Sequence, residues 1–507
     1  MSAPNQPPTR WQRRRARLCS APDRDPHTFL RPRVTQLQKT VGTAQLFTLA
    51  FGAAVGVGWI VVMGEWLDLA GPLGAITAFA AGAAVHLAVG LCYAEVASRL
   101  PIAGGEFVYT YANFGERAAF AIGWMLVLGY VGILTFEAVS VGWVLRSLFP
   151  GIEGPVAYRL FGEAVHVGSL IAGLLGMLGL AWFSYRGARA ATLLQDVLVY
   201  TFLLVVALFI GAGLFTGDGA NLEPLFRGTG AIRWSGVLAV FATTPMWYAG
   251  FVVIPQMMEE RAARSSPRSI ALGIALSIGI SGLFYCGVIL AASMVQPWQE
   301  ILALELPVAA TFERAFGSPL LGKIVLFCGL IGLITTWNTF LLGAARVLFA
   351  LGRAQLIAPR LGQVHPRNRS PANAVIFCAL LGSLGTFLGR PAIGFAINLF
   401  VTVGSLAFFA TCVGLLRLRA QSRNEAAPYR APGGRFTPLL GILASLGIFA
   451  LSLQQPYVRA NGGIPPEWFI LAGWILLGAG VWRVAHGRRQ QISPSDRRAL
   501  ILGDTEI

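Results

Sequence analysis

Long apolar blocks alternate along the chain with short segments rich in Gly, Pro and charged residues. Residues 193–215, for example, contain one Asp and otherwise almost only apolar residues. A bilayer core about 30 Å thick needs roughly 20 apolar residues per spanning helix, and lipid offers no hydrogen-bond partners to the backbone. The blocks therefore predict an all-α polytopic membrane protein with twelve spanning helices, at 44–70, 73–98, 117–148, 164–185, 192–216, 234–256, 269–294, 320–352, 372–389, 391–417, 437–455 and 467–485.

The basic residues predict how these helices are oriented. The sequence has 39 Lys and Arg against 23 Asp and Glu, a net charge of +16. With the N-terminus in the cytosol, 31 basic residues fall on the cytosolic side and 8 on the opposite side. Cytoplasmic loops carry the excess of Lys and Arg in membrane proteins. We therefore expect both termini in the cytosol of a cell-membrane protein, and we interpret the charge as a topology signal and not as a nucleic-acid-binding surface.

The remaining composition argues against several functional classes. The only lysines are Lys39 and Lys323, and neither belongs to a phosphate-binding loop, which disfavours an ATP motor on this chain. The six Cys and five His show no metal or redox spacing, so we expect no metal, no cofactor and no enzymatic activity. Residues 1–40 are rich in Arg and Pro and lack a signal-peptide apolar region, which predicts a disordered basic cytosolic tail.

Glycines interrupt the first predicted helix near its middle. Gly52, Gly56 and Gly58 lie within seven residues, and each Gly weakens a helix by about 1 kcal/mol relative to Ala. Gly52 and Gly56 also have the spacing of a close-packed helix face, which is the structural alternative. Gly56 and Gly58 lie on different faces, so packing alone does not require both. An unwound segment uses the freedom of glycine better, and irregular backbone at membrane depth lines a site or cavity.

The sixth predicted helix has a matching interruption. Pro245 and Pro255 flank Gly250, and together they should break this helix near its midpoint. Paired interrupted helices at corresponding places in two halves of a chain point to the binding site of a transporter. Helices 1 and 6 would form this pair.

Several separated motifs resemble the amino acid–polyamine–organocation (APC) superfamily of permeases. They are Gly52-x-x-x-Gly56-x-Gly58, residues 93–109, Gly250-Phe251 with Glu259-Glu260, Arg346-x-x-x-Ala350 with Pro359, and Tyr429-Arg430-x-Pro432. The resemblance runs from about Val41 to Trp482. It implies two inverted five-helix repeats (helices 1–5 and 6–10) with broken helices 1 and 6, plus two peripheral helices. The implied divisions are a core with helix 11 at 41–455 (repeats at about 41–216 and 234–417), helix 12 at 456–486 and a cytosolic tail at 487–507.

The resemblance also implies a substrate site where the two breaks face each other. Free N–H groups and the positive end of a helix dipole suit the carboxylate of an amino acid, and freed carbonyls suit its ammonium group. The carboxylate site is expected on helix 1, and the ammonium site on helix 6, whose aromatic residues would pack on the substrate or gate the site. Lipid-facing aromatic positions are the alternative. The candidate substrate-binding residues are Val55, Gly56, Val57, Gly58, Trp247, Tyr248, Ala249, Gly250 and Phe251.

Ionisable residues inside apolar blocks are expensive and are functional candidates by default. Glu137 in helix 3 is the candidate to bind a cationic substrate end or to cycle a proton; the alternative is a carboxyl that is hydrogen-bonded to a neighbouring helix. For Asp196 in helix 5, a capping or gating role competes with proton transfer. His86 is expected to be a satisfied interhelical histidine, and Glu65 and Asp68 to be vestibule or interface residues.

The coupling ion is less defined than the site. Some APC members carry a Lys in helix 5 in place of a sodium ion, and this chain has none there. Thr335, Thr336 and Asn338 offer oxygens for sodium, although hydroxyl side chains often bond to their own helix. We therefore favour proton coupling or exchange over sodium. Most charged residues of the cytoplasmic connections are expected on a solvated surface; the alternative is that several of them form ion pairs that hold one conformation closed and break in the other. These residues are Glu106, Glu116, Glu259, Glu260, Arg261, Arg264, Arg268, Arg353 and Arg360.

These patterns together predict a secondary active transporter that moves an amino acid across the membrane by alternating access. A transporter of a polyamine or small organic amine with the same fold is the alternative. A channel is disfavoured, because the sequence has no filter-like repeat and no ring of identical charges. The expected partners are the small-molecule substrate and the lipid bilayer.

Overall fold

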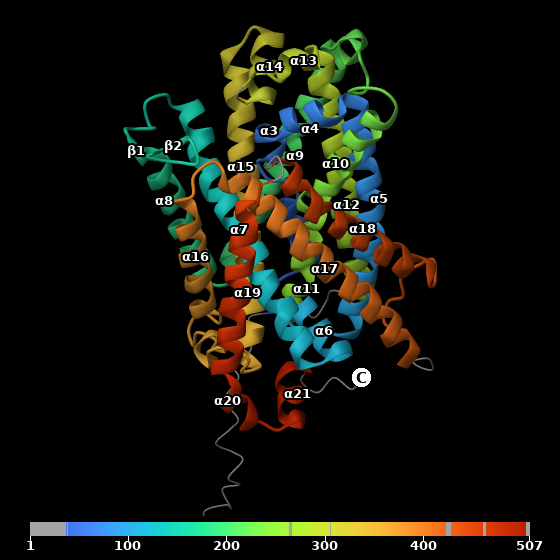
Figure 1. The fold of residues 1–507 in the computed structure, drawn as a ribbon, viewed down its shortest axis with the longest axis vertical. Coiled ribbons are helices and arrows are strands. Elements are labelled where there is room, and N and C mark those ends of the chain that lie inside the picture. The colour runs from blue at the N-terminus through green and yellow to red at the C-terminus, as the bar shows by residue number, and fades with distance from the viewer. Residues whose placement is uncertain are drawn as a thin grey trace, which may run out of the picture. The chain divides into compact units, whose positions relative to one another are not determined.

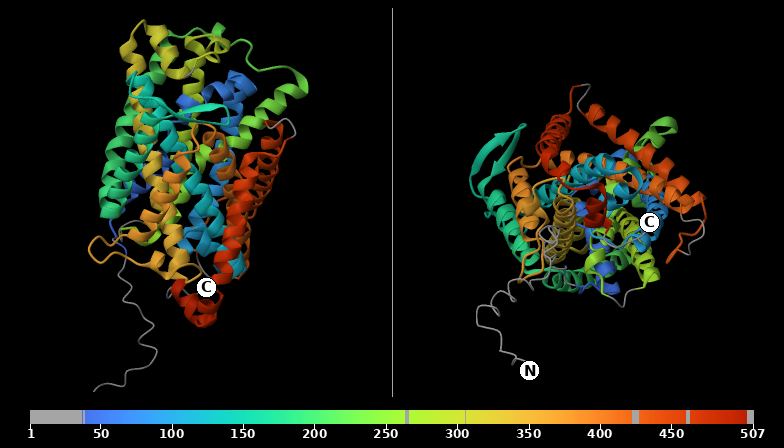
Figure 2. Two further views of the ribbon diagram at one scale, coloured as in Figure 1. Left: turned by 60° about the vertical axis from the view of Figure 1, so that its left-hand side comes forward. Right: turned by 90° about the horizontal axis from the view of Figure 1, so that it is seen from below.

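The computed structural model describes residues 37, 39–262, 266–304, 306–421, 427–459 and 463–502, so the predicted N-terminal tail lies almost wholly outside the described residues. The described chain is nearly all helical (Figure 1, Figure 2). Its longer helices are α2 (Thr43–Ala54), α4 (Met63–Ala70), α5 (Pro72–Arg99), α6 (Glu106–Phe114), α7 (Glu116–Leu148), α8 (Val167–Arg186), α9 (Ala188–Thr216), α10 (Gly230–Tyr248), α12 (Pro267–Val295), α14 (Pro307–Phe316), α15 (Pro319–Arg353), α16 (Ala372–Thr386), α17 (Ala392–Gln421), α18 (Phe436–Arg459), α19 (Pro466–Val484) and α21 (Pro494–Leu502). Shorter elements are α3 (Gly58–Val61), α11 (Val253–Gln256), α13 (Trp298–Ile301), α20 (His486–Gln490), the 3-10 helices η2 (Gly219–Leu222), η3 (Ala249–Val252), η4 (Met258–Glu260) and η5 (Pro359–Gly362), and the strands β1 (Val156–Leu160) and β2 (Glu163–His166).

Eleven helical segments among the described residues are long and apolar enough to cross a membrane, so this is a multi-pass membrane protein. They correspond to every predicted span except 372–389. That block forms α16, which has 15 residues, because the chain leaves the helix after Thr386 and turns at Gly389, where φ is 65°. At 1.5 Å per residue α16 is about 22 Å long, shorter than the hydrocarbon core.

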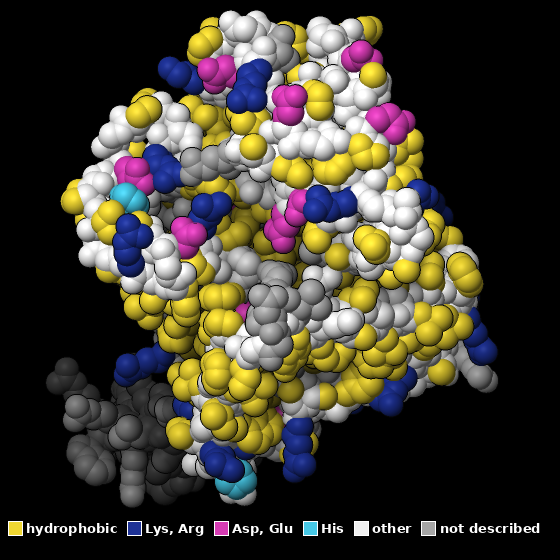
Figure 3. All heavy atoms as spheres, turned by 45° about the horizontal axis from the view of Figure 1, so that its top comes forward, with side chains coloured by type: hydrophobic (Ala, Val, Ile, Leu, Met, Phe, Trp, Pro, Cys, Tyr) yellow, Lys and Arg dark blue, Asp and Glu magenta, His cyan; other side chains and the backbone are white. Residues whose placement is uncertain are grey.

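Apolar side chains cover the flanks of the molecule, and charged side chains gather toward its ends (Figure 3). On α8 and α9, Leu175, Leu178, Leu204 and Leu208 are each 63–67% exposed. Lipid tails solvate such side chains as well as a protein core does, so these positions mark surfaces that face the bilayer.

The helices of the core pack on one another, and the C-terminal helices α18 and α19 are much less buried. α15 packs on α7, α9 and α16, and α5 packs on α10 and α12. α19 is largely exposed and is attached to α7 by a reciprocal tryptophan pair. The indole N–H groups of Trp124 and Trp474 each donate to the other residue's backbone carbonyl at 2.9 Å, and the rings stack with centroids 4.6 Å apart.

Two segments differ from the prediction. Residues 164–166, predicted to begin a helix, instead belong to β2, which pairs with β1 in an antiparallel hairpin, and α8 begins at Val167. The segment predicted as a C-terminal tail carries α20 and α21. There Arg489 and Arg497 both bind the Glu116 carboxylate, the first at 3.4 Å. Local apolar periodicity does not reveal either feature. The hairpin forms by backbone pairing of two neighbouring strands, and the C-terminal helices are held by polar contacts with a residue that is distant in the chain.

The prediction of a mostly solvated set of charges in the connections was wrong. Of the predicted residues that the structure describes, Arg268 and Arg360 are the exposed ones, and Arg264 lies outside the described residues. Glu260 and Arg346 are 1% and 0% exposed and form an ion pair in which Arg346 Nη2 donates to both carboxylate oxygens, at 2.8 and 3.1 Å. The backbone carbonyl of Glu260 also accepts the N–H groups of Thr40 and Val41, which anchors the start of the described chain. Burial raises the pKa of the Glu260 carboxyl, and the Arg346 charge opposes this effect.

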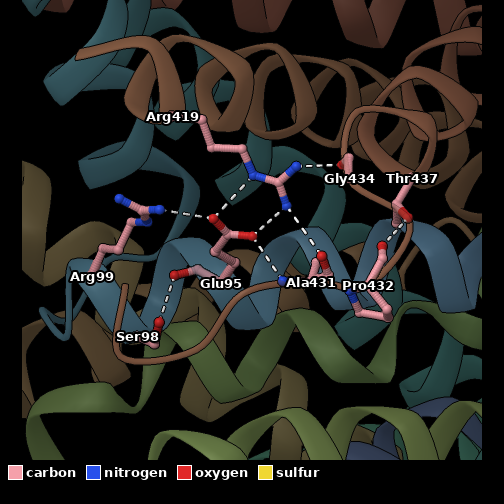
Figure 4. Close-up of polar contacts among 8 residues, drawn as sticks. All are labelled: Glu95, Ser98, Arg99, Arg419, Ala431, Pro432, Gly434 and Thr437. Atoms are coloured by element: carbon pink, nitrogen blue, oxygen red, sulfur yellow. Dashed lines mark hydrogen bonds and ion pairs between the residues drawn. The ribbon is translucent and has the colours of Figure 1, made fainter. Parts of the chain in front are cut away.

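A second buried carboxylate, Glu95, joins α5 to α17 and the segment that follows it (Figure 4). Its oxygens accept from the guanidinium groups of Arg99 at 2.9 Å and Arg419 at 3.1 Å, and from the backbone N–H of Ala431 at 2.8 Å. Glu95 is fully buried, so these bonds compensate the cost of removing its charge from water. The Tyr429–Pro432 motif is thereby held against the end of helix 2.

Removing the cation of the buried pair should destabilise the fold. Arg346→Gln leaves the Glu260 carboxylate buried without its partner, which costs about 3–5 kcal/mol. The matched control is Arg353→Gln, because the Arg353–Glu259 pair at 2.7 Å is partly exposed and should contribute about 0–1 kcal/mol. Denaturant unfolding in detergent micelles measures both. Equal losses in the two variants would contradict this account.

Candidate functional site

The first membrane segment is interrupted between α2 and α3. Helical geometry ends at Val55, with φ −117° and ψ 89°, and resumes at Gly58. The backbone N–H groups of Gly56 and Val57 have no hydrogen-bond acceptor among the described residues. Such groups are costly to bury, so this segment is a place where a ligand with acceptor atoms would be stabilised.

The glycines of this segment allow close approach and do not supply an unusual backbone conformation. Neither Gly56 nor Gly58 has a positive φ. A Cβ on Gly56 would lie 2.6 Å from Thr336 Oγ1 and 2.9 Å from Glu137 Oε1, and a Cβ on Gly58 would lie 2.2 Å from the Trp247 ring. These close contacts agree with the packing role that the sequence analysis gave as the alternative to backbone freedom.

The carbonyl groups at the end of α2 are satisfied by hydroxyl groups from other helices. A helix end leaves its last carbonyls without intrahelical donors. The Gly52 carbonyl accepts from Thr336 at 2.8 Å and from Thr335 at 3.3 Å, both on α15. The Ala54 carbonyl accepts from Tyr285 of α12 at 2.8 Å. Sequence reasoning missed Tyr285, since one Tyr in an apolar block carries no local signal of its partner.

The second interruption lies at the end of α10. Pro245 has no N–H, and the Phe241 carbonyl that this N–H would have served accepts from Thr244 Oγ1 at 2.7 Å. After Tyr248 the chain continues as η3 and then α11. A Cβ on Gly250 would lie 2.0 Å from the Ala50 carbonyl oxygen, so only glycine lets η3 approach α2 this closely.

Some of the candidate substrate-binding residues of helix 6 lie beside the break in helix 1, and others do not. All nine candidate substrate-binding residues are buried. The Trp247 ring covers Gly58, and its indole N–H donates to Thr243 at 3.0 Å. Tyr248 instead donates to the Phe79 carbonyl at 2.9 Å. Phe251 packs on Tyr93 and Phe408, with ring centroids 5.2 and 5.8 Å away.

Glu137 of α7 lies directly beside the break. Its side chain is 1% exposed, and Oε1 is the atom that a Cβ on Gly56 would meet. Oε2 has no hydrogen-bond partner among the described residues, and no cation there pairs with this carboxyl. A buried carboxyl group without a partner, next to unpaired N–H groups, can bind a cationic group or hold a proton.

The other ionisable candidates have structural partners or lie away from the break. Asp196 accepts from Gln45 at 2.7 Å and from Thr48 at 2.5 Å and so ties α9 to α2. His86 packs its ring on Tyr248 and Phe408 of two other helices, with centroids 5.4 and 5.8 Å away. Its Nδ1 lies 2.7 Å from the carbonyl of Gly82 in its own helix, and Nε2 has no partner among the described residues, so its interhelical contacts are ring contacts and not hydrogen bonds. Asp68 forms an ion pair with Arg227. Glu65 lines a cavity considered below.

The proposed sodium ligands act as structural donors in this structure. Besides the two threonines that bind the Gly52 carbonyl, Asn338 donates to the Ala191 carbonyl at 3.2 Å and to Gln195 at 3.1 Å. Gln195 in turn donates to the Thr48 carbonyl at 3.3 Å. These side chains connect α15, α9 and α2 around the break.

A buried carboxyl group, that of Glu106, binds the end of the sixth predicted helix that lies beyond its interruption. Glu106 is fully buried and accepts from Gln256, the last residue of α11, and from Tyr93 at 3.1 Å. Tyr109 of α6 and Tyr130 of α7 also face it, and no cation among the described residues pairs with it. Burial raises the pKa of Glu106 from 4.5 to about 7, although both hydrogen bonds oppose the shift.

A many-helix membrane protein with two facing helix interruptions has the architecture of a transporter. The sequence profile of the amino acid permease family matches residues 41–480. The chain therefore belongs to the amino acid permease family, within the APC superfamily that the motifs resemble, and it is a transporter and not an enzyme.

Named relatives cover most of the chain. It is 29% identical to a branched-chain amino acid permease of Bacillus subtilis over 81% of this chain and 87% of that protein. It is 27% identical to a methylthioribose transporter of the same organism, over 88% and 93%. It is 29% identical to human cationic amino acid transporter 4, over 79% and 62%.

The raised pKa of Glu106 predicts a pH-dependent contribution to stability. A carboxyl group that binds its proton more tightly in the folded state stabilises that state fully below pH 4.5, and the contribution is lost as the pH rises through about 7. The difference between these values corresponds to about 3 kcal/mol. Unfolding midpoints measured from pH 4 to 8 should fall more steeply for the wild type than for Glu106→Gln. Parallel curves would contradict the prediction.

Proposed function

We propose that this protein is a secondary active transporter that moves an α-amino acid across the plasma membrane by alternating access. The observation that carries the proposal is the break in helix 1. There the free N–H groups of Gly56 and Val57 lie beside the unpartnered carboxyl of Glu137, and the Trp247 ring covers Gly58. This arrangement offers donors, an acid and an aromatic surface at one buried point.

The proposed substrate pose follows from these charges. The substrate carboxylate accepts from the backbone N–H groups of Gly56 and Val57, where the dipole of the following helical turns adds a favourable positive potential. Val55, which was also predicted to serve the carboxylate, donates its N–H to the Phe51 carbonyl at 2.9 Å instead. The ammonium group lies near the carbonyls of Trp247, Tyr248 and Ala249. Gly250 lets the two breaks lie in contact, and Phe251 packs on Tyr93 and Phe408 behind the substrate site.

The proposed topology has twelve spans with both termini in the cytosol. The eleven apolar segments and α16 supply the spans, and α16 would cross where the bilayer adapts to its length. Residues of about 41–216 and 234–417 would form the two inverted repeats, with α18 and α19 outside them. The interruptions at 55–57 and 249–252 then occupy corresponding places in the first helix of each repeat.

The proposed substrate is a neutral α-amino acid, in line with the backbone site and with the branched-chain permease among the relatives. A cationic amino acid or small amine is the second candidate. It is favoured by the unpaired Glu137 carboxyl and by the similarity to human cationic amino acid transporter 4. Coupling to protons, or exchange, is proposed over sodium, because the hydroxyl groups on α15 are occupied with helix 1.

Glu137→Gln tests this proposal. The variant should lose at least about tenfold in uptake of a cationic substrate, or lose the proton dependence of uptake of a neutral one. Uptake and counterflow of radiolabelled leucine and lysine into proteoliposomes, at pH 5.5 and 7.5, measure both. Glu313→Gln, an exposed acid on α14, is the matched control. Wild-type uptake with a wild-type pH response would remove Glu137 from the mechanism, and ohmic currents without counterflow would contradict a transporter.

A further inference from the structure

A cavity of about 420 Å³ begins one helical turn beyond the break in helix 1. Val61, the last residue of α3, and Val62 form part of its wall, and Pro391 and Phe395 at the start of α17 form another part. Its volume lies in the range of small-molecule sites. Under the proposed topology this end faces outward. Figure 3, in which the upper end of Figure 1 comes forward, shows charged side chains of both signs on this face.

Charges of opposite sign line this cavity without neutralising one another. Arg390 stacks its guanidinium on Trp143, 4.4 Å from the ring centroid, and forms no ion pair among the described residues. Glu65 likewise has no ion-pair or hydrogen-bond partner among them. Glu467 is 4% exposed, and its side-chain partner there is the Asn398 amide at 3.4 Å. A nearly buried carboxylate with one long neutral hydrogen bond is poorly compensated.

A neighbouring cavity of about 100 Å³ provides the contrast. It shares Trp143 and Arg390 with the larger cavity and is bounded by the β1–β2 hairpin. Two acids line it, and one of them, Glu153, is bound by Arg146 at 2.9 Å and by His166 at 3.0 Å. An acid of that cavity is thus paired with basic side chains of the protein itself, whereas the acids of the larger cavity have no ion-pair partner among the described residues.

We propose that the larger cavity is a second binding site for a zwitterionic α-amino acid, which is held there before it reaches the break. The carboxylate pairs with Arg390, whose planar fork suits it, and the ammonium group lies between Glu65 and Glu467. The substrate side chain packs on Val61 and Phe395. This inference rests on the proposed function, and it adds a site that shares no residue with the break at 55–58.

Binding stoichiometry tests the second site. Radiolabelled L-leucine and L-lysine are titrated against the purified full-length protein in lipid nanodiscs by equilibrium dialysis. We expect the wild-type protein to bind two molecules of at least one of the two probes, and the Arg390→Gln protein to bind one. Arg390→Lys, which keeps the positive charge, should recover part of the second binding. Loss of a charge-assisted pair should also raise the KM for uptake about tenfold or more. Lys323→Gln, an exposed charge at the start of α15, is the control and should bind two molecules.

The outcomes separate this inference from the proposed function. One molecule bound per wild-type protein, with transport intact, overturns the second site alone. Two molecules bound to Arg390→Gln overturn the assignment of the site to this cavity. Binding of neither probe to the wild type contradicts the proposed function, and the second site with it. The Glu137→Gln variant tests the same separation at the other site. It should still bind the one probe molecule whose binding depends on Arg390.

Discussion

The satisfaction of backbone hydrogen bonds at the break in helix 1 is the constraint on which the rest of the structure depends. Ending α2 at Ala54 leaves carbonyls that lipid cannot serve. Thr335 and Thr336 of α15 and Tyr285 of α12 supply the missing donors, so three helices are fixed around the break. The N–H groups on the far side have no such partners among the described residues. The break is thus held rigidly on its carbonyl side and left open to a ligand on its amide side.

The same helix α15 links this site to the end of the molecule that carries the buried carboxyl groups of Glu260 and Glu106. Arg346 follows Thr336 by ten residues, which is about 15 Å along a helix, and it binds Glu260 just beyond the broken helix 6. Glu106 and Gln256 join the end of α11 to α6 close by. Buried charge pairs of this kind have one good arrangement, and breaking them is costly. A movement of helix 6 away from α15 and α6 would therefore cost these contacts.

Much of the fold followed from local sequence, because membrane spans and glycine or proline interruptions are local signals. The positions of eleven apolar segments, the break after Ala54 and the change of helix type after Tyr248 all lie where the apolar blocks and the Gly and Pro residues indicated. The hairpin at 156–166, the docking of Arg489 and Arg497 on Glu116, and the burial of Glu106 and Glu260 were not predicted. The hairpin is a local pairing of two short, partly exposed strands, so no apolar block marks it. The other features depend on partners that are distant in the chain, and the charge of a residue does not tell whether it meets water or a counter-charge. The placement of Glu137 beside Gly56 was anticipated only as far as helix 3 bordering the site.

The central claim is that the break at residues 55–57 binds the carboxylate of an amino acid substrate. A structure determined with saturating amino acid in lipid nanodiscs tests this claim most directly. The account predicts ligand density whose carboxylate lies within hydrogen-bond distance, about 2.7–3.2 Å, of the Gly56 and Val57 nitrogens, with Glu137 in the same pocket. A ligand bound only elsewhere, with the Gly56 and Val57 N–H groups still unpaired, would contradict it.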